Sequence, residues 1–184
     1  MSDIKFSRVW AMPNSNTFEV PPIADFVKRY LRESKVSIDP FARNNGWATY
    51  TNDLNPNTSA QYHMEAGDFL NYLATLGVEA DLFVLDPPYS ARQLKECYDD
   101  IGRKMLTTDA MTGAIRKNWR NAALKVLTKD AVALNFGWST VGFGKKNGFE
   151  IEEIMLVCHG SDHCDTICAA ERRITRQDSM FDSG

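Results

Sequence analysis

The stretch Asp81-Leu82-Phe83-Val84-Leu85-Asp86-Pro87-Pro88-Tyr89 decides how this sequence is interpreted. Its first five residues are mostly large and apolar, which predicts a buried strand over 81–85. Two consecutive prolines cannot continue a central strand, so the strand ends at Asp86. Ser90 and Gln93 fit a capping box, which predicts a helix directly afterwards. A buried strand, a rigid polar turn and a helix therefore follow one another.

Strand-like and helix-like patterns alternate along the rest of the chain. Strands are predicted at 36–38, 47–51, 61–65 and 131–136, and helices near 22–33, 68–76 and 113–128. The segments 149–157 and 166–171 predict a closing hairpin. This alternation predicts an α/β fold built on a mostly parallel sheet.

An aspartate stands just after each of four predicted strands. These residues are Asp39, Asp53, Asp68 and Asp86. In open α/β sheets the carboxyl ends of the strands form the edge at which ligands bind. Each aspartate alone could simply cap the following helix, but four in succession favour one shared crevice.

Composition and charge are those of an ordinary globular protein. The chain has 184 residues, of which 43% are hydrophobic and 24% charged, and its net charge is −3. No apolar run approaches the roughly 20 residues that a membrane-spanning helix needs. The residues after Met1 lack the layout of a secretory signal, so we expect a cytoplasmic protein that does not bind membranes.

One segment is basic within this acidic chain. Residues 99–129 carry seven basic and three acidic side chains. The candidates for contact with a nucleic-acid backbone are Arg103, Lys104, Arg116, Lys117 and Arg120. The segment fits a phosphate-contacting surface and the solvated face of a helix equally well.

Cysteine and histidine are concentrated near the C-terminal end of the sequence. Cys158, His159, His163, Cys164 and Cys168 fall within 11 residues, a density at which zinc sites occur. Zinc ligands normally come in two separated pairs, however, and here all five fall in one short stretch. We therefore favour a polar turn between two strands, with contact to a nucleic acid as the second interpretation, and predict no metal.

The tetrapeptide Asp86-Pro87-Pro88-Tyr89 resembles the motif of the amino-group DNA methyltransferases, in which Asp, Asn or Ser precedes Pro-Pro and an aromatic residue. The closest resemblance is to small phage and prophage adenine-N6 enzymes, as found in restriction-modification. It implies a Rossmann-like S-adenosylmethionine-dependent methyltransferase sandwich with a C-terminal antiparallel hairpin. It further implies one domain over 1–184, with a cofactor-binding half over 1–80 and a catalytic half over 81–184.

The chemistry of this family explains the residue types in the motif. The lone pair of an exocyclic amine is delocalised into its ring, so the amine is a poor nucleophile. By resemblance, Asp86 and the Pro87 carbonyl would accept the two N–H groups of that amine. Pro87 and Pro88 would hold the carbonyl at a fixed angle. Tyr89 would stack on a base flipped out of the duplex.

The resemblance also assigns residues to S-adenosylmethionine. Asp39-Pro40-Phe41 looks like the start of the family's cofactor loop, although Arg43-Asn44-Asn45 follow where the family has glycines. Asp53 stands where the family binds the ribose hydroxyls. Asp68 would accept from the adenine amino group of the cofactor, and Phe69 would flank its ring.

The expected function is therefore methyl transfer to N6 of adenine in DNA. Methylation of cytosine N4, or of RNA, is the nearest alternative. A different class of function is a catalytically inert binder of the same fold, acting as an anti-restriction decoy or as one subunit of a heterodimer. The short chain offers no obvious target-recognition domain, so we expect a homodimer or a helper subunit alongside DNA as partners.

Overall fold

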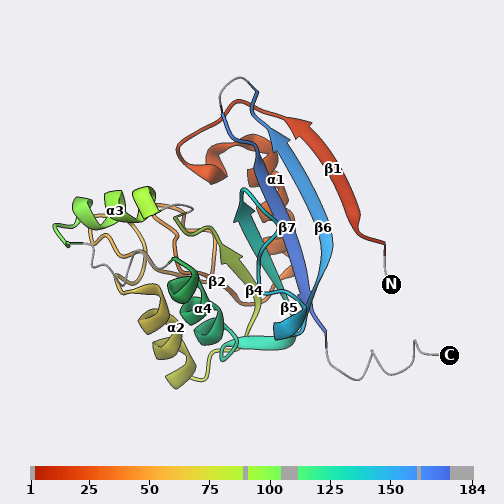
Figure 1. Ribbon diagram of the computed structural model, residues 1–184. Helices are drawn as coiled ribbons and strands as arrows, with labels where there is room; N and C mark the ends of the chain where they lie inside the picture. Colours follow the sequence, from red (N-terminus) through yellow and green to blue (C-terminus); the bar gives the residue numbers. More distant parts are fainter. Residues whose placement is uncertain (1–2, 89–90, 105–111, 161–162, 175–184) are drawn as a thin grey trace.

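A seven-stranded sheet in the order β1-β6-β7-β5-β4-β2-β3 forms the centre of the molecule (Figure 1). The computed structural model describes residues 3–88, 91–104, 112–160 and 163–174. The strands are β1 (Lys5–Trp10), β2 (Ser37–Asp39), β3 (Tyr50–Thr51), β4 (Ala80–Leu85), β5 (Leu127–Gly137), β6 (Phe149–Cys158) and β7 (Thr166–Arg173). The helices are η1 (Thr17–Glu19), α1 (Pro21–Glu33), α2 (Ala66–Thr75), α3 (Ala91–Asp100), α4 (Thr112–Ala123) and η2 (Lys145–Asn147).

The strands β2, β3, β4 and β5 are all parallel, as the alternation of strands and helices predicts. Two of the expected strands are shorter than predicted. The one expected at 47–51 is reduced to β3, and the one expected at 61–65 is a single bridge between Asn52 and Tyr62. This part of the sheet therefore consists largely of the loops that follow its strands.

The C-terminal hairpin is confirmed. β7 pairs antiparallel with both β6 and β5, and it lies between them in the sheet. The predicted fold class, a mostly parallel sheet with a C-terminal antiparallel hairpin, is therefore correct.

β1 is a strand that the sequence pattern did not predict. It pairs parallel with β6 at the outer edge of the sheet. Lys5 is exposed, and its Nζ lies 3.1 Å from the buried carboxylate of Glu153, which also accepts hydrogen bonds from Arg29 and Tyr30. The neighbouring Phe6 is also exposed. The usual alternation of apolar inside and polar outside is therefore absent.

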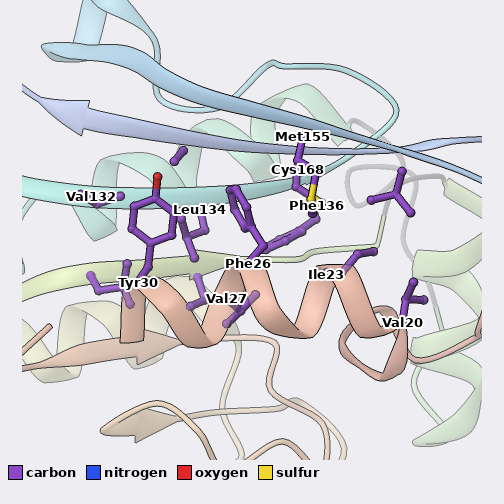
Figure 2. Packing of buried hydrophobic residues seen from close by; sticks show 14 of the residues in the cluster. Val20, Ile23, Phe26, Val27, Tyr30, Val132, Leu134, Phe136, Met155 and Cys168 are labelled. Carbon is purple, nitrogen blue, oxygen red and sulfur yellow. The ribbon is translucent and has the colours of Figure 1, made fainter. Parts of the chain in front are cut away.

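Helices cover the two faces of the sheet separately. α1 begins at two prolines and packs Ile23, Phe26 and Val27 against β5, β6 and β7 (Figure 2). α2 and α4 cover the opposite face, where Phe69, Leu70 and Leu73 join a second cluster with the apolar side chains of β4. Two hydrophobic layers therefore hold the sheet between them.

The helix predicted over 113–128 is shorter in the structure. α4 ends at Ala123, and Leu127 already belongs to β5. The Ala80 N–H donates to the Val126 carbonyl oxygen at 2.7 Å, which fixes the chain beside β4. Pairing with the sheet therefore overrides the helical spacing of Val126 and Leu127.

Within the described residues, the helices are all too short or too polar to cross a lipid bilayer.

Candidate functional site

Two of the four aspartates lie at the carboxyl ends of neighbouring parallel strands. Asp39 ends β2 and Asp86 directly follows β4. These strands pair with Ile38 opposite Phe83. Asp86 is half-buried, whereas Asp39 is only 3% exposed. The predicted crevice therefore has at least one carboxylate set deep in the protein and one nearer its surface.

Asp39 has an unusual electrostatic environment. Burial raises the pKa of its carboxyl from 3.8 to about 8, and the negative charges of Asp86 and Asp53 act in the same direction. A hydrogen bond from the Phe41 N–H to Asp39 Oδ1, 3.0 Å long, partly opposes this rise in the pKa. The charges of Asp53 and Asp86 therefore act on a buried Asp39 carboxyl that keeps its proton to about pH 8.

The raised pKa of Asp39 predicts that the protein loses stability as the pH rises from 4 to 8. In the unfolded chain Asp39 ionises near pH 4, while in the folded protein it keeps its proton to about pH 8. The folded state therefore binds the extra proton in this window, and stability falls by at most about 1.4 kcal/mol per pH unit. Urea unfolding at several pH values measures this slope.

Asp39→Asn is the comparison for that pH series, because it should lack this part of the slope. Burial also raises the pKa of the Glu171 carboxyl. That residue is present in both proteins, so its contribution cancels. Equal slopes in the wild type and the Asn variant would contradict the assignment.

Asn52 holds the loops of the crevice together, a role that the sequence pattern did not reveal. Its side chain is 1% exposed. The Asn52 Nδ2 donates to the carbonyl oxygens of Pro40 and Met64 at 3.1 and 3.0 Å, and the Met64 N–H donates back to Asn52 Oδ1 at 2.9 Å. One amide therefore links the loop after β2 to the segment before α2.

Arg43 stands at the position of the first glycine in the cofactor loop of the amino-group DNA methyltransferases, which the sequence resembles. Its φ is 51°, the one positive value among the described non-glycine residues. The Arg43 N–H donates to Asp53 Oδ2 at 3.1 Å, and its guanidinium donates to the Ser15 carbonyl oxygen at 3.3 Å. The loop thus keeps a left-handed conformation that glycine adopts freely and an L-residue adopts at a cost of about 1–2 kcal/mol.

Arg43→Gly should therefore be more stable than Arg43→Ala by about 1 kcal/mol, because only glycine relieves the backbone. Both variants lose the same bond to Ser15, so the difference isolates the left-handed conformation. Chemical denaturation of the two variants measures it. An alanine variant as stable as the glycine variant would show that the backbone at this position is unstrained.

Asp68 and Phe69 lie on α2 but point to different environments. Asp68 is exposed in the first turn of the helix. Phe69 is 0% exposed and packs in the second cluster, with its ring 5.3 Å from that of Tyr62. A side chain with no open surface cannot flank a cofactor ring, so we leave Phe69 out of the candidate site.

Phe41 belongs to an aromatic contact between the loop after β2 and α4. It is half-buried and packs edge-on against Trp119 of α4, with the ring centroids 4.8 Å apart. The Trp119 Nε1 donates to Glu65 Oε1 at 2.6 Å, while Glu65 Oε2 accepts from the Gly67 and Asp68 N–H groups. Glu65 therefore fixes both the start of α2 and the position of Trp119.

A small pocket lies beside the Pro-Pro motif. Its volume is about 140 Å³, and it is lined by Leu85 and Pro87, by Trp119 and Arg120 of α4, and by Asn135, Phe136, Gly137, Trp138, Ser139 and Val141. Liquid water occupies roughly 30 Å³ per molecule, so the pocket has room for only a few waters. A ligand group of that size is a single heterocyclic ring system. The glycine-containing loop after β5 thus forms one wall of this pocket.

Asn135 gives this pocket a polar wall. Its Nδ2 donates to Glu171 Oε2 at 3.0 Å, which fixes the orientation of the amide. Its Oδ1 is buried and accepts no hydrogen bond within the described part of the chain. A buried acceptor without a partner costs about 1–3 kcal/mol.

The structure describes three of the four residues of the Asp-Pro-Pro-Tyr motif. Asp86, Pro87 and Pro88 lie within the structure, and Pro87 is buried where it lines the small pocket. Burial raises the pKa of the Cys168 thiol, and the negative charge of Asp86 raises it further. Tyr89 lies outside the described residues, as does Ser90 of the predicted capping box.

The five basic candidates do not share one environment. Arg103 and Lys104 are exposed after α3, with the Arg103 guanidinium 4.7 Å from the Tyr98 ring. Lys117 is exposed on α4, and Arg120 donates to the Gly142 carbonyl oxygen at 2.8 Å. The side chain of Arg116 lies outside the described residues. Arg120 therefore has a structural bond, whereas Lys117 faces solvent.

The cysteines and histidines lie around the turn from β6 to β7. Cys158 and Cys168 are buried, and Cys164 is exposed. His159 Nδ1 lies 2.9 Å from the Ala11 carbonyl oxygen, which can only accept, so Nδ1 carries the proton. Its Nε2 then accepts from Thr166 Oγ1 at 3.0 Å. Both nitrogens are engaged, and no cluster of three metal-ligating side chains occurs in the described ranges.

Comparison with solved structures identifies the fold. The chain is similar to TrmN from Thermus thermophilus (TM-score 0.53, 14% identity, 84% of this chain and 49% of that one). It is also similar to SMU.776 complexed with SAH (TM-score 0.52, 12% identity, 80% and 48%) and to NSun6 from Pyrococcus horikoshii with SFG (TM-score 0.50, 18% identity, 80% and 50%). The fold is that of S-adenosylmethionine-dependent methyltransferases.

The chain spans about half the length of these solved proteins. No protein-family model and no curated protein matches its sequence.

Proposed function

We propose that this protein transfers the methyl group of S-adenosylmethionine to an exocyclic amine, and specifically to N6 of adenine in DNA. The observation that carries the proposal is the position of Asp86 and Pro87. In a methyltransferase fold, they follow β4 next to the buried Asp39 at the end of β2, and Pro87 lines a pocket the size of one base.

The residues of the crevice fit this cofactor. S-adenosylmethionine has a net positive charge, because its sulfonium and ammonium groups outnumber its one carboxylate, and Asp53 provides negative potential beside Asp39. Asp53 would accept from the ribose hydroxyls and Asp68 from the adenine amino group. When bound, the cofactor supplies an electrophilic methyl group. SAH, present in one similar structure, is what remains after methyl transfer.

The residues of this chain would prepare the amine for attack. Asp86 and the Pro87 carbonyl would accept its two N–H groups, which favours a pyramidal nitrogen with an available lone pair. Asn135 also lines this pocket, and its buried Oδ1 accepts no hydrogen bond within the described residues. The exposed ring of Trp138, beside the same pocket, offers a surface on which a flipped base can stack. After transfer, the nitrogen gives up one proton, which Asp86 would receive.

One observation favours an inert binder instead. Arg43 replaces glycine in the cofactor loop, where a side chain hinders the close approach of backbone to ligand. The positive φ of Arg43 shows, however, that the loop keeps the conformation a glycine would take. We therefore place catalysis first.

The test is incubation of the purified chain with labelled S-adenosylmethionine and unmethylated DNA, single-stranded DNA or RNA, followed by nucleoside analysis. N6-methyladenine in DNA supports the proposal. N4-methylcytosine or methylated RNA would move the assignment to those substrates. Cofactor binding without methyl transfer to any of these nucleic acids would support the catalytically inert binder instead.

A further inference from the structure

A second, larger cavity opens on the same face of the sheet as α4. It is a groove of about 780 Å³ between α4 and the segment 140–151. α4 contributes Lys117 and Arg120 to one wall, and η2 contributes Lys145 and Lys146 to the other. Four cations from two separate elements therefore converge on one groove.

The acidic residues in this groove do not cancel those charges. Glu171 is 1% exposed and is held by N–H groups of Phe143 and Gly144 at 2.6 and 3.0 Å. Glu150 lies 3.9 Å from Lys145, and the two side chains are 45% and 83% exposed. An exposed ion pair of this kind is worth about 0–1 kcal/mol, so a phosphate can displace it. The groove is thus positive in a chain whose net charge is −3.

The groove adjoins the small pocket beside Pro87. Arg120 and Val141 line both cavities. Arg120 is fixed by its bond to the Gly142 carbonyl oxygen, so it shapes the junction between them. When a base occupies the small pocket, the backbone of the strand that carries it would therefore lie at the mouth of the groove.

We propose that this groove binds the phosphodiester backbone of the single nucleic-acid strand whose target base enters the small pocket, with Lys117, Lys145 and Lys146 contacting phosphates. This inference rests on the proposed function and adds the path of the substrate strand. Phosphate contacts by lysine release counterions, so they leave a measurable dependence on salt. Lys145 and Lys146 lie outside the basic segment 99–129 in the sequence, and only the fold brings them to the groove.

The test measures binding of a fluorescent single-stranded oligodeoxynucleotide across a salt series by anisotropy. The variant Lys117→Gln/Lys145→Gln/Lys146→Gln should bind on the order of ten- to hundred-fold more weakly at 0.15 M salt. The slope of log affinity against log salt should fall in magnitude by about 2, since each contact to a single strand contributes about 0.7. The charge-preserving triple Lys→Arg variant should keep the wild-type slope.

The matched control is Arg32→Gln/Lys35→Gln/Lys129→Gln, which removes the same charge at exposed positions that do not line the groove. It should change affinity less than two-fold. Equal weakening by both Gln triples, or no binding by the wild type, would overturn the proposal. The assay needs neither cofactor nor turnover. If the triple Gln variant loses binding but the wild type never methylates a nucleic acid, only the proposed function is refuted. If the wild type methylates but the triple Gln variant binds as tightly as it does, only the groove proposal is refuted.

Discussion

Asp86→Ala is expected to lower the rate of methyl transfer on the order of 10²–10⁴-fold, while binding of S-adenosylmethionine is kept. The reason is that the carboxylate would act on the amine and not on the cofactor. Asp86 directly follows β4 and is only half-buried, so its removal should leave the sheet intact. Single-turnover transfer from labelled cofactor and calorimetric titration of the cofactor measure the two effects separately.

Asp86→Asn provides the matched control for this prediction. It removes the same charge, and therefore lowers the pKa of Asp39 in the same direction, yet it keeps an acceptor oxygen. Asparagine also occupies this position in the motif that the chain resembles. The Asn variant should accordingly be more active than the Ala variant. If Asp86→Ala transfers methyl groups within ten-fold of the wild type, the catalytic assignment of Asp86 fails.

Gly142→Ala is expected to lower the free energy of unfolding by about 2–4 kcal/mol, the largest stability effect that we predict. A Cβ at this position would lie 2.0 Å from Glu171 Oε2 and 2.4 Å from Asn135 Nδ2. Both atoms belong to buried side chains that hydrogen-bond to each other, so neither can withdraw easily. Urea denaturation measures the loss.

Gly46→Ala is the control, because a Cβ at that position would meet no atom within 4 Å. It should change stability by less than about 0.5 kcal/mol. The clash at Gly142 requires its partner, so Gly142→Ala should cost less in a Glu171→Ala background. Equal costs in the two backgrounds would show that Glu171 is not the cause.

The fold was largely predictable because its central strands are buried on both faces. Such strands, of which β4 is the clearest, appear in sequence as continuous apolar runs. The short strand β3 and the edge strand β1 were harder to predict. β3 has only two residues, and in β1 the neighbouring Lys5 and Phe6 are both exposed. Neither shows the periodicity on which strand prediction depends.

The site was predictable where its residues follow a strand directly. Asp39 and Asp86 could be placed from the sequence because each comes at the end of an apolar run. Asn52 could not, since its function depends on Pro40 and Met64, each twelve residues away along the chain. Phe69 was assigned to the cofactor although it packs in the core, because sequence spacing does not show which side of a helix faces the crevice.

The parallel pairing of β1 with β6 has a consequence for how the chain folds. The Ala11 carbonyl oxygen meets His159, and Arg8 contacts Cys158, across 148 and 150 positions of sequence. During synthesis β1 leaves the ribosome long before its partner exists. Contacts of such high separation slow folding, because the loop between them must be closed first. The earliest strand to be translated is therefore expected to be among the last to dock.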